Sequence, residues 1–65
     1  MQGNVKFFDS TRGFGFISRQ QGQDLFVHAT NLHPDARGEL ADGQLVEFEV
    51  GTGRKGEEAR NVRPI

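Results

Sequence analysis

The sequence predicts an all-β fold, a small five-stranded antiparallel barrel. Turn-forming residues divide the 65-residue chain into five short apolar runs. None of these runs has the periodicity of an amphipathic helix, whereas residues 44–50 alternate apolar and polar side chains with period two. Five short strands separated by glycine turns are typical of a small barrel, which also removes most exposed strand edges.

Each strand is bounded by turn chemistry. The first ends at Asp9, where Asp, Ser and Thr follow one another, and residues 20–23 supply a hairpin loop. Residues 29–42 are polar and are expected to be mostly loop, with one short helical turn at Thr30 and Asn31 limited by Pro34. Residues 51–56 form a glycine-rich turn. The predicted strands are residues 4–8, 13–19, 24–28, 44–50 and 58–62.

Length and composition predict one domain, residues 1–65, in the cytoplasm. The chain contains no cysteine, so neither a disulfide nor a cysteine-rich zinc site stabilises it. His28 and His33 have no evident third ligand, and no metal or other cofactor is expected. No apolar run approaches the ~18 residues of a membrane span, and no signal peptide is evident. A chain this small also offers no oxyanion hole or pocket for a small-molecule substrate, so it is not expected to be an enzyme.

Alternation along the strands separates an aliphatic face from an aromatic one. Residues i and i+2 of a strand share a face. The predicted core consists of Val5, Ile17, Leu25, Val27, Val46, Phe48 and Val50. The opposite face of the two strands joined by the 20–23 hairpin carries Phe14, Phe16, Phe26 and His28 side by side.

Exposed phenylalanines are costly, because each forgoes roughly 1.5–3 kcal/mol of burial. No helix is predicted to cover this face, so it is interpreted as a ligand platform, with a hidden core or a dimer seam as alternatives. Unpaired nucleobases suit such a platform, since every base offers a π-face for stacking. The net charge of −1 excludes a large basic field for gripping duplex DNA. Residues 1–33 carry a net charge of +1 and residues 34–65 carry −2, so an anionic partner should prefer the first half.

Two motifs then point to a known family. Residues 12–17, Arg-Gly-Phe-Gly-Phe-Ile, resemble an aromatic RNA-binding motif, and residues 25–28, Leu-Phe-Val-His, resemble its companion. Their order is reversed relative to the RNA-recognition-motif fold, and the intervening helices are missing. The whole chain resembles the cold-shock domain of bacterial cold-shock proteins, through residues 3–8, 42–48 and 55–62 as well. This resemblance implies an OB-type barrel.

The resemblance also implies which residues contact a nucleic-acid strand. The matching positions are Lys6, Phe7, Phe8, Arg12, Phe14, Phe16, Phe26 and His28, and Arg37 replaces a loop aromatic of many members. Strict alternation from Val5 would turn Phe7 inward and Phe8 outward, so a contribution from both requires a twist or bulge. Phe7 stands where tryptophan is usual, Asp9 where asparagine is common and Ala29 where an aromatic is frequent. These departures imply weaker binding, a shorter footprint or a shifted preference.

The function predicted is that of a non-enzymatic protein that binds single-stranded RNA or DNA. The family role would be RNA chaperoning under cold or other stress, with effects on translation or transcription. Two alternatives remain: a module that dimerises or docks a partner through the aromatic face, and a DNA-directed binder that affects replication. The expected oligomeric state is a monomer, with a dimer left open.

Overall fold

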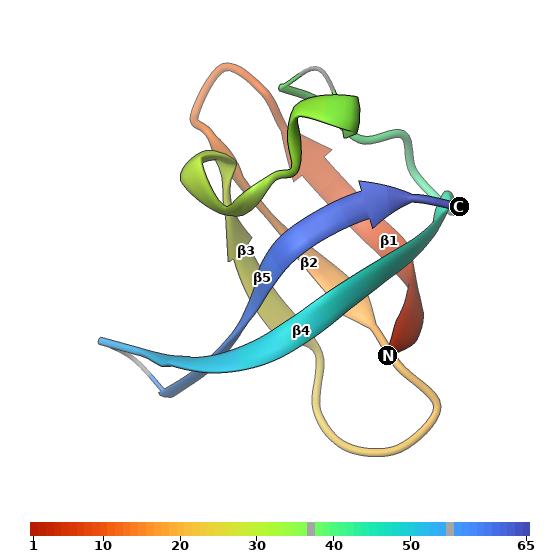
Figure 1. The fold of residues 1–65 in the computed structure, drawn as a ribbon, viewed down its shortest axis with the longest axis vertical. Coiled ribbons are helices and arrows are strands. Elements are labelled where there is room, and N and C mark those ends of the chain that lie inside the picture. The colour runs from red at the N-terminus through yellow and green to blue at the C-terminus, as the bar shows by residue number, and fades with distance from the viewer. Residues whose placement is uncertain (37, 55) are drawn as a thin grey trace.

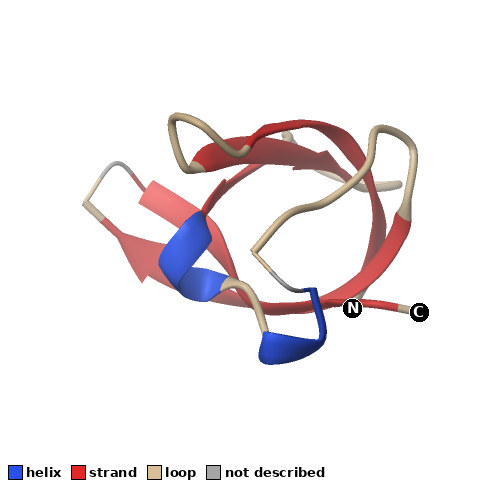
Figure 2. Cartoon of the chain, turned by 90° about the horizontal axis from the view of Figure 1, so that it is seen from above, coloured by secondary structure: helices blue, strands red, loops and turns tan. Residues whose placement is uncertain are grey.

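The chain folds into a closed five-stranded β-barrel (Figure 1). The computed structural model describes residues 1–36, 38–54 and 56–65. The strands are β1 (Gln2–Asp9), β2 (Phe14–Ser18), β3 (Leu25–His28), β4 (Leu45–Gly53) and β5 (Gly56–Pro64). They neighbour one another in the order β1-β2-β3-β5-β4, and β1 pairs with β4 to close the ring, as the view along the barrel shows (Figure 2).

The predicted all-β barrel is confirmed, but the prediction that it is purely antiparallel is wrong. Four of the five strand pairs are antiparallel, whereas β3 and β5 run parallel and meet at the pair Phe26 and Glu58. Hairpins join β1 to β2 and β2 to β3, so these pairs must be antiparallel. The connection from β3 to β4 is long and leaves the direction of β5 beside β3 free to differ, which no local pattern could reveal.

The described residues of the 29–42 segment contain more regular structure than the predicted loop. They contain two 3₁₀ turns, η1 (Ala29–Asn31) and η2 (Pro34–Ala36). The helical turn expected at Thr30 and Asn31 is therefore present and ends before Pro34, which begins a second turn. The segment passes over one end of the barrel (Figures 1 and 2). Two of its own residues, Ala36 and Leu40, are buried.

The core matches the predicted aliphatic face with one exception. Val50 is 36% exposed, although it belongs to the clean period-two run of β4. Val50 pairs with the buried Ala59 but lies beyond Glu47, the last β4 residue paired with β1, where the β4–β5 hairpin extends past the closed part of the barrel. The buried set comprises Val5, Ile17, Leu25, Val27, Ala36, Leu40, Val46, Phe48, Ala59 and Val62.

The β4–β5 hairpin is longer than expected, since most of the glycine-rich turn is strand. β4 continues to Gly53 and β5 begins at Gly56, with Gly53 and Gly56 paired. Near the other end of the hairpin, Arg63 donates hydrogen bonds to Glu47, and these bonds together with the positive charge of Arg63 lower the pKa of the Glu47 carboxyl. No helix in the described part of the chain is long and apolar enough to cross a bilayer.

The difference in burial between Val46 and Val50 makes a matched pair of substitutions informative. Val46 is fully buried, so Val46→Ala should lower the free energy of unfolding by about 2–3 kcal/mol through lost burial and a cavity. Val50→Ala removes the same atoms from an exposed site and should cost less than about 1 kcal/mol. Urea unfolding of both variants measures the difference. Equal losses would contradict the exposure of Val50.

Candidate nucleic-acid interface

A β-bulge in β1 turns Phe7 to the outside of the barrel. Val5 faces Ile17 of β2, whereas Phe7 faces Phe16, so β1 contains one residue more than β2 between these pairs. The extra residue is Lys6, and both Lys6 and Phe7 are exposed as a result. A bulge of this kind re-aims the side chains that follow it. The structure therefore contains the bulge that the outward placement of Phe7 required.

Four phenylalanine rings form one continuous surface, here called the aromatic platform: Phe7, Phe14, Phe16 and Phe26. Cross-strand register places them together, because Phe16 is the partner of both Phe7 and Phe26. Ring centroids lie 6.3 Å apart for Phe7 and Phe14, 5.6 Å for Phe7 and Phe16, 6.0 Å for Phe14 and Phe26, and 5.8 Å for Phe16 and Phe26. These distances fall in the range of favourable aromatic pairs. Each ring supports two others and keeps one face or edge toward solvent.

Phe8 lies differently from the platform residues. It is half-buried and packs against the core. Its strand partner Gly15 explains why, since a Cβ at Gly15 would lie 2.3 Å from the Phe7 carbonyl oxygen and 2.7 Å from the Phe8 Cα. Only glycine lets β1 and β2 approach so closely between Phe14 and Phe16. Of the sequence-predicted aromatic contacts, Phe8 is thus the one that the structure separates from the platform.

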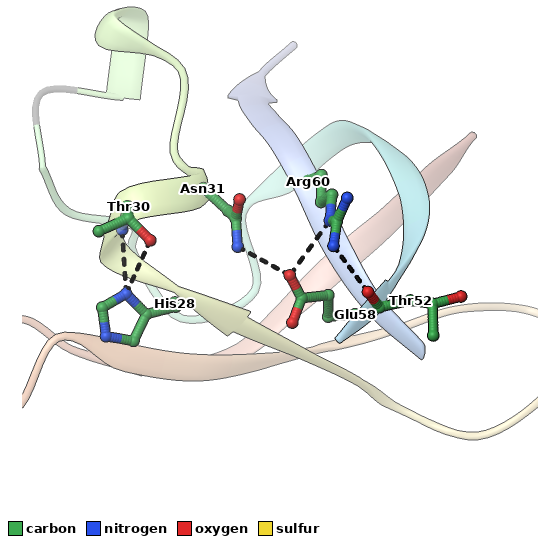
Figure 3. Close-up of polar contacts among 6 residues, drawn as sticks. All are labelled: His28, Thr30, Asn31, Thr52, Glu58 and Arg60. Atoms are coloured by element: carbon green, nitrogen blue, oxygen red, sulfur yellow. Dashed lines mark hydrogen bonds and ion pairs between the residues drawn. The ribbon is translucent and has the colours of Figure 1, made fainter. Parts of the chain in front are cut away.

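His28 continues the platform beyond Phe14, its strand partner. Its ring is exposed, and its Nδ1 accepts a hydrogen bond of 3.2 Å from the Thr30 backbone N–H at the start of η1 (Figure 3). A neutral imidazole that accepts at Nδ1 carries its proton on Nε2. His28 therefore presents an N–H donor on the side of the ring away from Thr30.

An open groove of about 1050 Å³ runs along the platform between β2, β3 and the β4–β5 hairpin. Its charged lining residues are balanced, with three arginines and three carboxylates among the described residues. The arginines are Arg12, Arg19 and Arg54, and the carboxylates are Asp24, Glu57 and Glu58. The described lining of the groove consequently has aromatic walls and no net charge. A surface of this kind favours stacking over long-range attraction of phosphate.

The cations near the platform differ in how available they are. Arg12 is largely exposed and lies 4.0 Å from Asp9, whose Oδ1 also accepts hydrogen bonds from the backbone of the β1–β2 turn. Lys6 Nζ lies 2.9 Å from Asp24 Oδ2, which ties the bulge to the groove rim.

Arg19, in contrast, is only 15% exposed. It donates to the Gln23 carbonyl and pairs with Glu57, so it braces the β2–β3 loop and is not free to meet phosphate. Arg37, a further predicted contact, lies outside the described residues.

The described residues offer no cluster of three His, Asp or Glu side chains that could hold a metal ion. The site therefore consists of rings, hydrogen-bonding groups and paired charges, which suits reversible binding of a flat, polar, anionic ligand.

Comparison with known proteins identifies the family of the chain. The family model of the 'Cold-shock' DNA-binding domain matches residues 1–65. The chain belongs to the cold-shock domain family. This family is non-enzymatic and binds nucleic acids, so the chain is a nucleic-acid-binding cold-shock protein.

Three relatives illustrate how far the similarity extends. The chain is 43% identical over 65 residues to a cold shock-like protein of Thermotoga maritima, covering 100% of this chain and 98% of the relative. It is 47% identical over 62 residues to cold shock-like protein CspC of Bacillus cereus, covering 95% of each. It is 46% identical over 63 residues to cold shock-like protein CspE of Escherichia coli, covering 95% of this chain and 91% of the relative.

Sequence reasoning missed one part of the groove. Glu58, which no sequence motif singled out, is half-buried beside Phe26 and contacts Asn31 and Arg60 (Figure 3). Its position depends on the parallel pairing of β3 with β5. No signal within the β5 sequence indicates that pairing.

The platform geometry predicts that Phe16→Ala weakens single-strand binding. Phe16 contacts two other rings, and one stacked base contributes roughly 1–3 kcal/mol, so affinity should fall about 5- to 150-fold. The melting temperature should change little, because Phe16 is not among the core residues. Anisotropy titration and thermal melting test the two effects separately. A collapse of the melting temperature with unchanged affinity per folded molecule would assign Phe16 to the core.

The balanced charges of the described groove lining predict that the affinity for single strands depends only weakly on salt concentration. For single strands, the slope of log K against log salt is about −0.7 per neutralised phosphate, so about 2–3 contacts give roughly −1.4 to −2.1. Arg12→Gln should flatten the slope by about 0.7, whereas Phe14→Ala should lower affinity equally at every salt concentration. Titrations from low to high salt measure both. A wild-type slope steeper than about −4 would mean that backbone charge dominates.

Proposed function

We propose that this cold-shock protein binds single-stranded RNA or DNA by stacking unpaired bases on the aromatic platform. The observation that carries the proposal is the contact of four phenylalanine rings on the outside of the barrel, along an open groove. Bases in a duplex already stack on one another and cannot offer their faces to a protein surface. Stacking on Phe7, Phe14, Phe16 and Phe26 therefore selects unpaired strands.

The surrounding polar groups complete the proposed site. Arg12 and Lys6 lie where a strand on the platform would bring its phosphates, and the exposed side chains of both can move toward them. His28 supplies a stacking ring and an Nε2–H donor for a base edge. Phe8 packs against the core and contributes to the site only through the part of its ring that remains exposed. These roles follow the positions that the sequence analysis selected.

Selective binding of unpaired strands is sufficient for RNA chaperoning. A protein that binds the open form of an RNA and not the paired form shifts the equilibrium toward melting by mass action. This mechanism requires no nucleotide hydrolysis and no metal. Acting on RNA in the cytoplasm, the protein would keep strands accessible and thereby influence translation or transcription during stress.

Matched oligonucleotides test the proposal directly. Fluorescence anisotropy should give at least tenfold tighter binding to a single strand than to a duplex of the same sequence, because one stacked base already contributes roughly 1–3 kcal/mol. Sedimentation of the same samples should show a monomer that binds the oligonucleotide. Equal affinity for the two forms would overturn the stacking mechanism. A dimer that shields the platform and binds no oligonucleotide would favour a protein-interaction module.

A further inference from the structure

The groove contains a carboxylate that the proposed stacking mechanism does not use. Glu58 is the strand partner of Phe26 across the parallel β3–β5 contact, so its side chain lies next to a ring of the aromatic platform. Neighbouring strands are about 4.8 Å apart. A base stacked on Phe26 therefore brings one polar edge over Glu58.

The Glu58 carboxylate is held in a fixed orientation. Its Oε2 accepts hydrogen bonds from Asn31 Nδ2 at 3.1 Å and from Arg60 Nε at 3.2 Å (Figure 3). Arg60 is itself fixed, because its Nη2 donates to the Thr52 carbonyl at 2.7 Å. The donors come from η1 and β5, so two separate elements hold the group.

Glycines in β4 make room for this arrangement. A Cβ at Gly53 would lie 1.9 Å from Glu58 Oε1, and a Cβ at Gly51 would lie 2.4 Å from Arg60 Nε. The two side chains therefore lie across the β4 backbone at these glycines. Oε1 accepts no hydrogen bond from any described residue, which leaves acceptor capacity on the carboxylate.

Glu58 also differs from the other two carboxylates of the groove in its burial. Its side chain is 17% exposed, compared with 37% for Asp24 and 62% for Glu57. A shielded carboxylate has already lost most of its water, so a hydrogen bond from a ligand displaces less hydration there. Among the three, Glu58 is the carboxylate best placed to discriminate between bases.

Resting on the proposed function, we infer that Glu58 is a specificity-determining residue that favours bases with an exocyclic amino group. An ionised carboxylate only accepts hydrogen bonds. Cytosine offers its N4 amino group at the position where uracil and thymine present the O4 carbonyl. The amino group donates to Glu58, whereas the carbonyl oxygen is repelled by it. Cytosine strands should therefore bind more tightly than uracil strands of equal length.

Heptamers of deoxycytidine and deoxyuridine test this inference, since the two rings stack alike and differ at the polar edge. At pH 7.5 the wild-type protein should bind the cytosine heptamer about fivefold more tightly or better, the lower end of discrimination by base-edge contacts. Glu58→Gln supplies both a donor and an acceptor at the same place and should bring the two affinities within about twofold, mainly by improving the uracil heptamer. Anisotropy titrations give all four dissociation constants.

Glu57→Gln is the matched control. It removes the same charge from the next residue of the groove lining, but from a highly exposed side chain that pairs with Arg19. The Glu57→Gln variant should change the dissociation constants of both heptamers in the same direction and leave the ratio of the two constants unchanged. If Glu57→Gln changes the ratio as much as Glu58→Gln, general electrostatics account for the preference and the inference is wrong.

The ratio of the two dissociation constants of the wild-type protein also tests the inference, whether or not the variants fold. Equal binding of the two heptamers, or preference for uracil, overturns the role of Glu58 while leaving the stacking proposal intact. Failure to bind either heptamer overturns the stacking proposal itself. A lowered melting temperature for Glu58→Gln with an unchanged ratio would make Glu58 a structural brace, which also contradicts the inference.

Discussion

The parallel contact between β3 and β5 is the constraint on which the rest of the architecture depends. It joins the β1-β2-β3 sheet to the β4–β5 hairpin and closes the ring. With closure, alternate residues of every strand have only two environments, the interior and the outer surface. The interior takes the aliphatic side chains, so the phenylalanines of β2 and β3 must face outward. The same contact brings Glu58 beside Phe26 and thus introduces a carboxylate from the far end of the chain into the groove.

The alternation of apolar and polar residues was sufficient to predict which side chains face inward in strands joined by a hairpin. Strands β2 and β3 are joined by a six-residue loop, residues 19–24, so alternation alone placed Ile17 inside and Phe16 outside. The features that could not be predicted depend on distant partners or on a change of register. Val50 is exposed because it lies beyond the part of β4 that pairs with β1, and Leu40 is buried because its segment passes over the barrel end. In both cases the strands that decide the burial lie far away in the sequence.

The candidate site shows the same division. Phe14, Phe26 and His28 followed from alternation, whereas Phe7 needed a bulge that only the family resemblance suggested. The charged residues were least predictable, because ion pairing redistributes them after folding. Arg19, for example, is occupied by the Gln23 carbonyl and by Glu57, which lies 38 residues away along the chain. Composition gives the number of charges, but the fold decides which of them remain free.

The small core has a thermodynamic consequence. Unfolding changes the heat capacity by about 12–15 cal/mol/K per residue, which for 65 residues is only about 0.8–1 kcal/mol/K. The partly exposed rings of the platform reduce the apolar contribution further, since they already contact water in the folded state. A small heat-capacity change gives a shallow curve of stability against temperature. Cooling therefore lowers the stability of this barrel only gradually. Because few aromatic rings are buried, several remain free for a ligand, and the fold also tolerates low temperature.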